Sequence, residues 1–459
     1  MMETDIIILA AGKGTRMKST LPKVLHQLAG KSLLQHVIDS ANHVQDSRIT
    51  VVTGHGSEQV RSSVSSSEKS VLSYVEQTEQ LGTAHAVQMA VPNLGNGGTS
   101  LILYGDVPLI LPETILEMLS AVSESSMSLL TVALDDPTGY GRILRDESGQ
   151  VTSIIEQKDA SAEQLKVREV NTGVLAVKTD QLKQWLPQID NNNAQGEYYL
   201  TDLIALARDN GVSIETKQPQ FVEEVEGVNN RIQLSALERF YQKQQAEKLM
   251  VAGVTLADPE RIDVRGVLNT GNDNYIDINA VFEGNVTLGS NVIIGPNCQI
   301  IDSQIGDGAE IKANSVIEQS EVGSGSIIGP FARLRPGTVL AEKAKVGNFV
   351  ETKNTQVGKG SKINHLSYVG DSELGEGVNV GAGTITCNYD GANKHKTIMG
   401  DNSFIGSNSS LVAPVKIGKN ATVGAGSTIS KDVPDDELGL TRASQKSISD
   451  WQRPTKKSK

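Results

Sequence analysis

Residues 1–228 show short apolar runs alternating with amphipathic stretches. The apolar runs fall at Ile6–Leu9, Ile49–Val52, Leu101–Tyr104 and Leu129–Val132, and the amphipathic stretches include Leu33–Ala41 and Glu113–Val122. Gly, Asp and Pro bound the apolar runs, which is typical of buried strands. The alternation predicts a doubly wound, Rossmann-like α/β domain with a mostly parallel sheet and helices on both faces. Ligands in such sheets bind beyond the carboxyl ends of the strands.

From about residue 252 a different pattern begins, in which aliphatic residues recur six apart and glycine often follows them. The clearest pairs are Leu288-Gly289, Ile294-Gly295, Val322-Gly323, Ile328-Gly329, Val346-Gly347, Val369-Gly370, Val380-Gly381, Ile405-Gly406, Ile417-Gly418 and Val423-Gly424. A period of six fits neither a helix nor an isolated amphipathic strand, but it is typical of a parallel β-helix of hexapeptide repeats. Such repeats usually wind left-handed, against the general rule for parallel crossovers. We therefore predict a left-handed parallel β-helix.

Between these two patterns, residues 229–251 are expected to form a linker helix. A broken apolar stripe runs through Ile232, Leu234, Leu237, Phe240 and Leu249 among charged and amide residues. The predicted organisation is thus a domain at 1–228, the helix at 229–251, and a β-helix domain with a C-terminal tail at 252–459.

One segment interrupts the repeat pattern, and a basic tail follows the last repeats. Residues between Thr386 and Met399 are too polar and turn-rich to continue the coil, so we expect a protruding loop, either functional or a tolerated insertion. The basic tail Arg453–Lys459 is interpreted as a solvated chain end.

Composition narrows the function classes. The net charge of -12 argues against general nucleic-acid binding. No apolar run approaches the roughly 20 residues that span a bilayer, and no basic segment precedes an apolar one at the start, so we expect neither membrane insertion nor secretion. The two cysteines, Cys298 and Cys387, form no disulfide framework or zinc-ligand spacing. A cytoplasmic protein is the simplest interpretation.

A glycine-rich loop follows the first apolar run. Gly12 and Gly14 let backbone N–H groups approach a triphosphate, and Lys13, Arg16 and Lys23 supply positive charge. A dinucleotide fingerprint would need a third glycine at Met17, and the segment before Gly30-Lys31-Ser32 lacks the first glycine of a Walker A loop.

Asp106 ends the run Leu101–Tyr104-Gly105. A carboxylate at the carboxyl end of a strand is well placed to hold Mg²⁺ against a nucleoside triphosphate, but an ordinary turn aspartate is an equal alternative on these residues alone.

Longer motifs resemble the sugar-nucleotide pyrophosphorylases. They comprise the glycine-rich loop, Pro22-Lys23, Gln80–Ala84, Tyr104–Asp106, Pro137–Arg142, Asn171–Gly173, Asn191–Tyr199 and Glu226–Asn230. With the hexapeptide half attached, nearly the whole chain resembles the bacterial family that combines N-acetylglucosamine-1-phosphate uridyltransferase and glucosamine-1-phosphate acetyltransferase. The resemblance implies an enzyme of UDP-N-acetylglucosamine biosynthesis, which serves cell-envelope polysaccharides.

The resemblance assigns roles in the first domain. It implies phosphate contacts at Leu9, Ala10, Ala11, Gly12, Arg16 and Lys23, uracil contacts at Gln77, Gly82 and Thr83, and ribose or N-acetylglucosamine contacts at Tyr104, Gly105, Gly141, Glu156 and Asn171. It implies Mg²⁺ as cofactor, with Asp106 and Asn229 as protein ligands, and UTP and N-acetylglucosamine 1-phosphate as substrates. The chemistry needs no nucleophilic side chain, because positioning and charge stabilisation suffice for phosphoryl transfer.

Acetyl transfer to an amine needs a base, and the repeat half offers His365 and His395. Ile363 and Val369 take inward positions, so His365 projects outward. Composition alone favours an ordinary surface histidine, whereas the resemblance implies that His365 is the general base. It also implies sugar-phosphate contacts at Arg335, Lys353, Tyr368 and Asn379, and acetyl-CoA contacts at Ala382, Asn388, Tyr389, Ser407, Ala425 and Arg442.

Hexapeptide acyltransferases of this kind generally assemble as trimers with sites between neighbouring coils, so the resemblance implies a homotrimer. Two alternatives stay open at this point: a regulatory protein, and a single-activity nucleotidyltransferase whose coil serves only assembly. The implied metal ligands and base, with the cation, favour catalysis over regulation: Asp106, Asn229, Lys23 and His365. The presence of His365 and of the Asn388-Tyr389 loop argues against a coil that serves only assembly.

Overall fold

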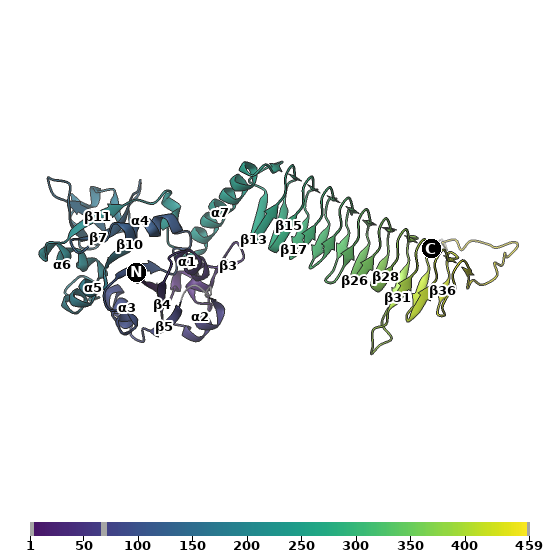
Figure 1. Cartoon of the computed structure of the whole chain (residues 1–459), viewed down its shortest axis with the longest axis horizontal. Coiled ribbons are helices and arrows are strands. Elements are labelled where there is room, and N and C mark those ends of the chain that lie inside the picture. The colour runs from purple at the N-terminus through teal and green to yellow at the C-terminus, as the bar shows by residue number, and fades with distance from the viewer. Residues whose placement is uncertain (1–3, 66–70, 457–459) are drawn as a thin grey trace. The chain divides into compact units, whose positions relative to one another are not determined.

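The computed structural model describes residues 4–65 and 71–456 and divides into two compact units, Met1–Tyr241 and Gln242–Lys459. The last three residues of the basic tail lie outside the described residues. Figure 1 shows a layered α/β unit and a unit of stacked coils. No helix within the described ranges is both long and apolar enough to cross a membrane.

A twisted central sheet organises the first unit, in the order β11-β7-β10-β6-β1-β4-β5. The strands are β1 (Thr4–Ala10), β4 (Ser47–Thr53), β5 (Val71–Glu76), β6 (Thr99–Tyr104), β7 (Ser126–Ala133), β10 (Glu169–Lys178) and β11 (Ser213–Lys217). Off this order, β8 (Arg142–Arg145) pairs with β10, and β9 (Val151–Ile155) pairs with β8. A separate two-stranded sheet consists of β2 (Gln27–Leu28) and β3 (Lys31–Ser32). β10 runs antiparallel to both β6 and β7. This departure from a fully parallel sheet is possible because β8, β9 and β10 follow one another through connections without a crossover helix.

Helices cover both faces of this sheet, as the alternation predicts. They are α1 (Leu33–Ala41), α2 (Ser57–Ser63), α3 (Thr83–Ala90), α4 (Pro112–Ser120), α5 (Thr179–Trp185) and α6 (Leu203–Asp209). On β1, Ile6 and Ile8 pack with residues of α1, α2 and α4, whereas Ile7 and Leu9 pack with α3, α5 and α6. Successive strand residues point to opposite faces, so one buried strand serves two hydrophobic layers.

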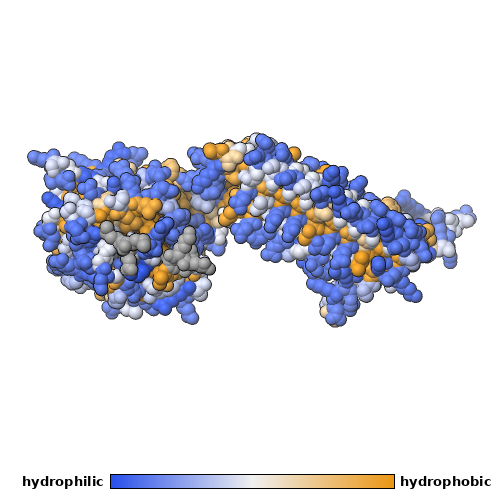
Figure 2. Space-filling model, in the orientation of Figure 1, coloured by the Kyte–Doolittle hydropathy of each residue, from blue (hydrophilic) through white to orange (hydrophobic). Residues whose placement is uncertain are grey.

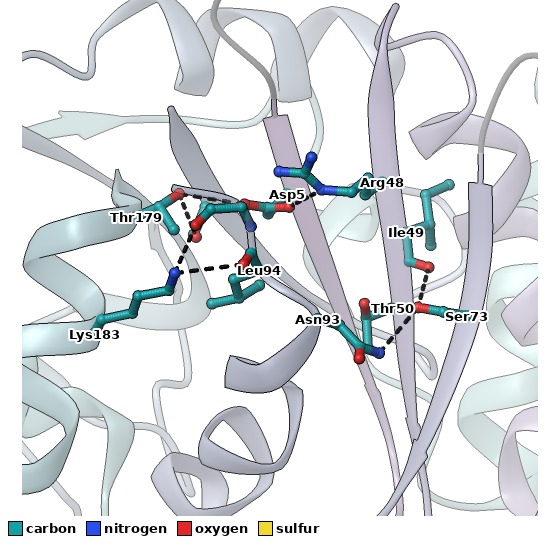
Figure 3. Close-up of polar contacts among 11 residues, drawn as sticks. Asp5, Arg48, Ile49, Thr50, Ser73, Asn93, Leu94, Thr179 and Lys183 are labelled. Atoms are coloured by element: carbon teal, nitrogen blue, oxygen red, sulfur yellow. Dashed lines mark hydrogen bonds and ion pairs between the residues drawn. The ribbon is translucent and has the colours of Figure 1, made fainter. Parts of the chain in front are cut away.

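A polar network holds the amino ends of the central strands (Figure 3). Asp5 is 1% exposed, and its Oδ1 accepts a hydrogen bond from Nε of Arg48 at 2.7 Å. The backbone N–H of Gly95 donates to its Oδ2 at 3.0 Å, and Lys183 donates to the carbonyl of Gly95 at 2.6 Å. The network fixes the edge of the sheet opposite the carboxyl ends, where the candidate site lies.

Helix α7 (Arg231–Val251) lies within the predicted linker segment. Its first half contributes Leu237 to a cluster with Met17 and Leu33, and its second half contributes Ala246 and Leu249 to the core of the coil unit. Ile232 lies on the solvent side of the helix and is 82% exposed. It therefore does not belong to the apolar packing stripe that the sequence predicted.

The second unit is a parallel β-helix. One coil consists of β16 (Ile293–Ile294), β17 (Gln299–Ile301) and β18 (Gln304–Ile305), and the next of β19 (Glu310–Ile311), β20 (Val316–Glu318) and β21 (Glu321–Val322). Each strand pairs in parallel with the strand one coil later. Ile294, Ile311 and Ile328 stack on the axis with no exposure, which confirms the inward assignment of the six-residue period.

Further coils carry the same arrangement to the end of the unit. The first strands are β12 (Thr255–Leu256), β13 (Ile262–Thr270), β14 (Tyr275–Ile276) and β15 (Ala280–Leu288). The later ones are β22 (Ile327–Ile328), β23 (Arg333–Leu334), β24 (Val339–Leu340), β25 (Lys345–Asn348), β26 (Glu351–Val357), β27 (Lys362–His365), β28 (Tyr368–Leu374), β29 (Asn379–Val380), β30 (Ile385–Cys387), β31 (Thr397–Met399), β32 (Phe404–Ile405), β33 (Ser410–Val412), β34 (Val415–Ile417), β35 (Thr422–Val423), β36 (Thr428–Ile429) and β37 (Leu438–Gly439). The expected loop stands off the coil between β30 and β31 (Figure 1).

Candidate active sites

The first candidate site is a cavity of about 340 Å³ at the carboxyl ends of β1 and β6. Its lining includes Leu9, Ala10, Ala11, Gly12, Lys23, Gln77, Gly82, Thr83, Tyr104 and Asp106, all of which the resemblance implied. The N–H of Gly105 donates to the carbonyl of Leu9 at 2.9 Å and joins the two strand ends. The glycine-rich loop and Asp106 therefore face one space, although they lie far apart in the sequence.

Gln80 and Glu197 also line this cavity, and the sequence assigned neither a role. Nε2 of Gln80 donates to the carbonyl of Ala11 at 2.6 Å and so holds the glycine-rich loop against the segment before α3. Both residues lie inside motifs that carried the family resemblance, which is the signal that could have singled them out.

Four polar side chains cluster beside the loop. The ammonium of Lys23 forms an ion pair with Oδ2 of Asp106 and lies 3.2 Å from Oδ1 of Asn229. Nη2 of Arg16 donates to the same Oδ1 at 2.9 Å. The N–H of Val228 donates to the carbonyl of Asp106 at 2.9 Å and keeps the Asn229 segment next to β6. Two side-chain oxygens, Oδ2 of Asp106 and Oδ1 of Asn229, thus accept from one ammonium.

The amide of Gln77 is oriented by its neighbours. Its Nε2 donates to the carbonyl of Gly82 at 3.1 Å and lies 3.0 Å from Nδ1 of His85. Gly82 has φ +119°, and a Cβ there would lie 2.5 Å from the carbonyl oxygen of Tyr198, so only glycine fits this close approach.

A smaller cavity of about 90 Å³ shares Tyr104 and Thr83 with the first. Glu156 and Asn171 line it, and the N–H of Asn171 donates to the carbonyl of Gly141 at 2.9 Å. Burial, together with Asp159 and Asp202, raises the pKa of Glu156. Burial, with Asp106 and Glu156, also raises the pKa of Tyr104, so its phenol stays protonated and can donate a hydrogen bond.

The second candidate site lies on the β-helix around His365. Nδ1 of His365 lies 2.8 Å from Oδ1 of Asn348, which faces it across β25 and β27. Because an amide oxygen only accepts, Nδ1 carries a proton, and in the neutral ring the lone pair is then on Nε2. Asn348 was not predicted, since it precedes His365 by a full coil.

His365 belongs to a vertical row that we call the base column: Asn348, His365, Ala382, Ser407 and Ala425. Each member follows the inward aliphatic residue of its coil by two positions. A Cβ added to Gly426, the residue after Ala425, would lie 4.0 Å from Cδ of Arg442, so Arg442 lies next to the end of the column. The structure therefore brings three of the implied acetyl-CoA residues, Ala382, Ser407 and Ala425, into line with the implied base.

Cations flank the column on the next side of the coil. Arg335 and Lys353 follow paired residues of β23 and β26 and lie one coil apart. Nη1 of Arg335 donates to Oε1 of Glu351 at 2.8 Å, and Glu351 pairs with Tyr368 one coil later. Asn379 lies in β29, one coil after Lys362 of the strand that carries His365.

The protruding loop is internally bonded. The N–H of His395 donates to the carbonyl of Asn388 at 2.8 Å and closes its base. Oδ2 of Asp390 lies 2.7 Å from Nε2 of His395, and the N–H of Asn393 donates to Oδ1 of Asp390 at 2.7 Å. Asn388 is 7% exposed at the root, whereas Tyr389 is 60% exposed.

Family models match three parts of the chain. A MobA-like NTP transferase domain matches residues 6–163, a GMPPB C-terminal domain matches residues 265–352, and the bacterial transferase hexapeptide (six repeats) matches residues 396–431. Among solved structures, UDP-glucose pyrophosphorylase complexed with UDP-glucose aligns with TM-score 0.43 and 18% identity over 53% of this chain and 100% of that chain.

Relatives match from end to end. "Bifunctional protein GlmU" of Marinobacter nauticus is 59% identical over 99% of this chain and 100% of its own length, and that of Cellvibrio japonicus is 58% identical over 99% and 100%. The protein of the same name from Idiomarina loihiensis is 56% identical over 99% of both chains. The chain belongs to the bifunctional GlmU family. Membership in this family confirms the prediction of an enzyme that combines a uridyltransferase with a hexapeptide acetyltransferase. The alternative, in which the coil serves only assembly, is not favoured.

Proposed function

We propose that this GlmU-family enzyme acetylates glucosamine 1-phosphate with acetyl-CoA on the β-helix and then transfers uridylyl from UTP to N-acetylglucosamine 1-phosphate in the α/β unit. The observation that carries the proposal is the presence of two chemically different sites in two compact units. One has a carboxylate, an amide oxygen and cations beside a cavity, and the other has an oriented imidazole beside cations.

In the α/β unit, a phosphate oxygen of N-acetylglucosamine 1-phosphate attacks the α-phosphorus of UTP in line, and pyrophosphate leaves. The backbone of Leu9–Gly12 and the side chains of Lys23 and Arg16 hold the phosphates, while Gln77 and Gly82 contact uracil. The smaller cavity, with Glu156 and Asn171, takes the sugar. Positioning and charge stabilisation account for the rate, so no side chain forms a covalent bond.

Asp106 and Asn229 fit a Mg²⁺ ion. Both direct an oxygen at the same ammonium, so the pair already accommodates a cation. Two protein oxygens suit Mg²⁺, which usually keeps several waters and binds substrate phosphates. When bound there, Mg²⁺ would neutralise charge on the phosphates. Within the described ranges no cluster of three His, Cys, Asp or Glu side chains offers another metal site.

On the β-helix, Nε2 of His365 takes a proton from the amino group of glucosamine 1-phosphate as the nitrogen attacks the thioester carbonyl. A C–N bond forms, the C–S bond breaks, and the proton passes to the departing CoA thiolate. Arg335, Lys353, Tyr368 and Asn379 hold the sugar phosphate. The members of the base column above His365, with Asn388, Tyr389 and Arg442, hold acetyl-CoA.

We further propose a homotrimer in which neighbouring coils meet at an apolar ridge formed by Phe331, Phe349 and Leu366. These residues are 50%, 56% and 63% exposed, and the two phenylalanine rings stack with centroids 5.3 Å apart. Figure 2 shows hydrophobic residues recurring along the coil. Leu366 directly follows His365, so a partner coil on the ridge would lie beside the base.

UTP and acetyl-CoA are substrates available in the cytoplasm, and we propose that the enzyme acts in the cytoplasm.

Two assays on one preparation test the proposal. The purified protein should release pyrophosphate from UTP and N-acetylglucosamine 1-phosphate with Mg²⁺, and should release thiol from acetyl-CoA and glucosamine 1-phosphate. Failure of either assay with folded protein removes that half of the proposal.

A further inference from the structure

Asp371 occupies a conformationally unusual place in the β-helix. It belongs to a vertical row that we call the left-handed column: Gly284, Asp302, Gln319, Gly337, Asn354 and Asp371, all with positive φ. Asp371 has φ +48° and is only 9% exposed. Asp302 has φ +43°, is exposed, and accepts a hydrogen bond from the backbone N–H of Asn285 at 2.9 Å. A buried aspartate in this column needs an explanation that the backbone alone does not give.

The carboxylate of Asp371 contacts groups from the coil before it and the coil after it. Nδ2 of Asn354, one coil earlier, donates to its Oδ1 at 2.7 Å. Nδ2 of Asn388, at the root of the protruding loop, donates to its Oδ2. Nζ of Lys353 lies 3.9 Å from the same Oδ2. One carboxylate therefore touches both the lysine proposed to hold the sugar phosphate and the asparagine proposed to contact acetyl-CoA.

The surrounding charges keep this group ionised. Burial alone would raise the pKa of Asp371, but hydrogen bonds from Asn354 and Asn388 and the charges of Lys353 and Lys394 outweigh it, so the pKa is lowered. Lys394, on the loop, lies close enough to Lys353 to lower the pKa of that lysine. The carboxylate thus offsets the repulsion between two cations that come from different parts of the chain.

We propose that Asp371 is a positioning residue for acetyl transfer, which holds Lys353 toward the sugar phosphate and fixes Asn388 and the loop root toward acetyl-CoA. The inference rests on the proposed acetyltransferase site and adds a residue to it. Because Nδ2 of Asn388 donates to Asp371, the side-chain oxygen Oδ1 of Asn388 faces away from that carboxylate and is left to accept a hydrogen bond from acetyl-CoA. The same contact couples the two substrate positions.

The substitution Asp371→Asn removes the negative charge of the side chain and keeps its size and shape. Asparagine adopts left-handed φ readily, so the coil keeps its conformation. The new amide removes the countercharge of Lys353, and because it has one acceptor oxygen it can bond both Asn354 and Asn388 only if one of those two amides turns over. Asp371→Ala removes every contact. Asp302→Asn and Asp302→Ala are matched controls, because they make the same changes in the same column at similar φ, away from the loop.

The experiment uses the full-length protein with three measurements. Thiol release should fall at least tenfold in kcat/KM in both Asp371 variants, with KM for glucosamine 1-phosphate and for acetyl-CoA both raised. Pyrophosphate release should stay within twofold. Trypsin cleavage after Lys394, followed by mass spectrometry without substrates, should be several-fold faster in Asp371→Ala. Both Asp302 variants should match the wild type in all three.

The possible results distinguish a failure of the role of Asp371 from a failure of the proposed acetyltransferase function. Wild-type protein without thiol release would overturn the acetyltransferase proposal and the role of Asp371 with it. Active wild type together with Asp371→Asn within twofold of it would overturn the role of Asp371 alone. Equal losses in the Asp302 and Asp371 variants, or a fall in kcat with both KM values unchanged, would show a general effect on the coil and would also contradict the inference.

Discussion

Nδ1 of His365 lies 2.8 Å from Oδ1 of Asn348, and the two residues face each other on adjacent coils. The contact fixes the tautomer that leaves Nε2 free to accept a proton. Asn348→Ala should therefore lower kcat for thiol release at least about tenfold, because a well-placed base typically contributes 10²–10⁴-fold. Pyrophosphate release should not change.

Asn348→Asp is the matched variant for this contact, since a carboxylate also accepts from Nδ1. Most of the thiol release lost in Asn348→Ala should therefore return, because the ring keeps its orientation and its Nδ1–H keeps an acceptor. An Asn348→Asp variant as inactive as Asn348→Ala would contradict the proposed orientation of the ring.

Glu156 should make the folded state less stable at neutral pH. Burial raises its pKa above the value of the unfolded chain, so the folded protein binds the proton more tightly. Stability is therefore lost as pH rises from the unfolded pKa, about 4.3, through the folded one. Glu156→Gln should raise the Tm at pH 7, and the gain should shrink as pH falls toward 4. A gain that is equal at both pH values would exclude this cause.

Gly173 sets the position of the Tyr104 ring between the two cavities of the α/β unit. A Cβ at Gly173 would lie 2.5 Å from Cε2 of Tyr104. Gly173→Ala should displace the ring and lower pyrophosphate release at least about tenfold, because a displacement near 1 Å can cost 10²-fold. Gly149→Ala is the control, since Gly149 has φ +82° but no atom within 4 Å of the added methyl. Equal losses in both would implicate backbone strain.

The apolar ridge should hold the proposed trimer together. Asn279, Asn297 and Asn314 occupy the equivalent left-handed corner in earlier coils, so Phe331→Asn with Phe349→Asn should leave the fold intact. Light scattering should show a lower mass for the double variant than for the wild type, and thiol release should fall with it. A double variant that keeps the wild-type mass would remove the ridge from the assembly contact.

The β-helix was predictable because its rule is local. Each inward aliphatic such as Ile294 or Val346 lies within six residues of the next, and the buried positions follow that period. Contacts between coils were not predictable in the same way. Asn348 contacts His365, and Asp371 contacts Asn388, because the two residues of each pair lie one coil apart in the sequence. Outside the protruding loop, the number of residues in a coil varies by one along the unit, so the six-residue period does not give these pairs.

In the α/β unit, the strands and the glycine-rich loop follow from local composition, but the antiparallel β10 and the cluster at Lys23 depend on the tertiary fold. Lys23 and Asp106 are 83 residues apart in sequence and meet because β1 and β6 pair in parallel. Family motifs placed both residues in one site, whereas residue chemistry alone left Asp106 open as a turn.

The two proposed sites should fail independently, and a crossed pair of variants tests this most directly. His365→Ala should lower thiol release at least about 100-fold and leave pyrophosphate release within twofold, since it removes only a general base. Asp106→Ala should abolish pyrophosphate release and spare thiol release. Both reactions are measured on each folded variant. Comparable damage to both reactions by either substitution would contradict two separate sites.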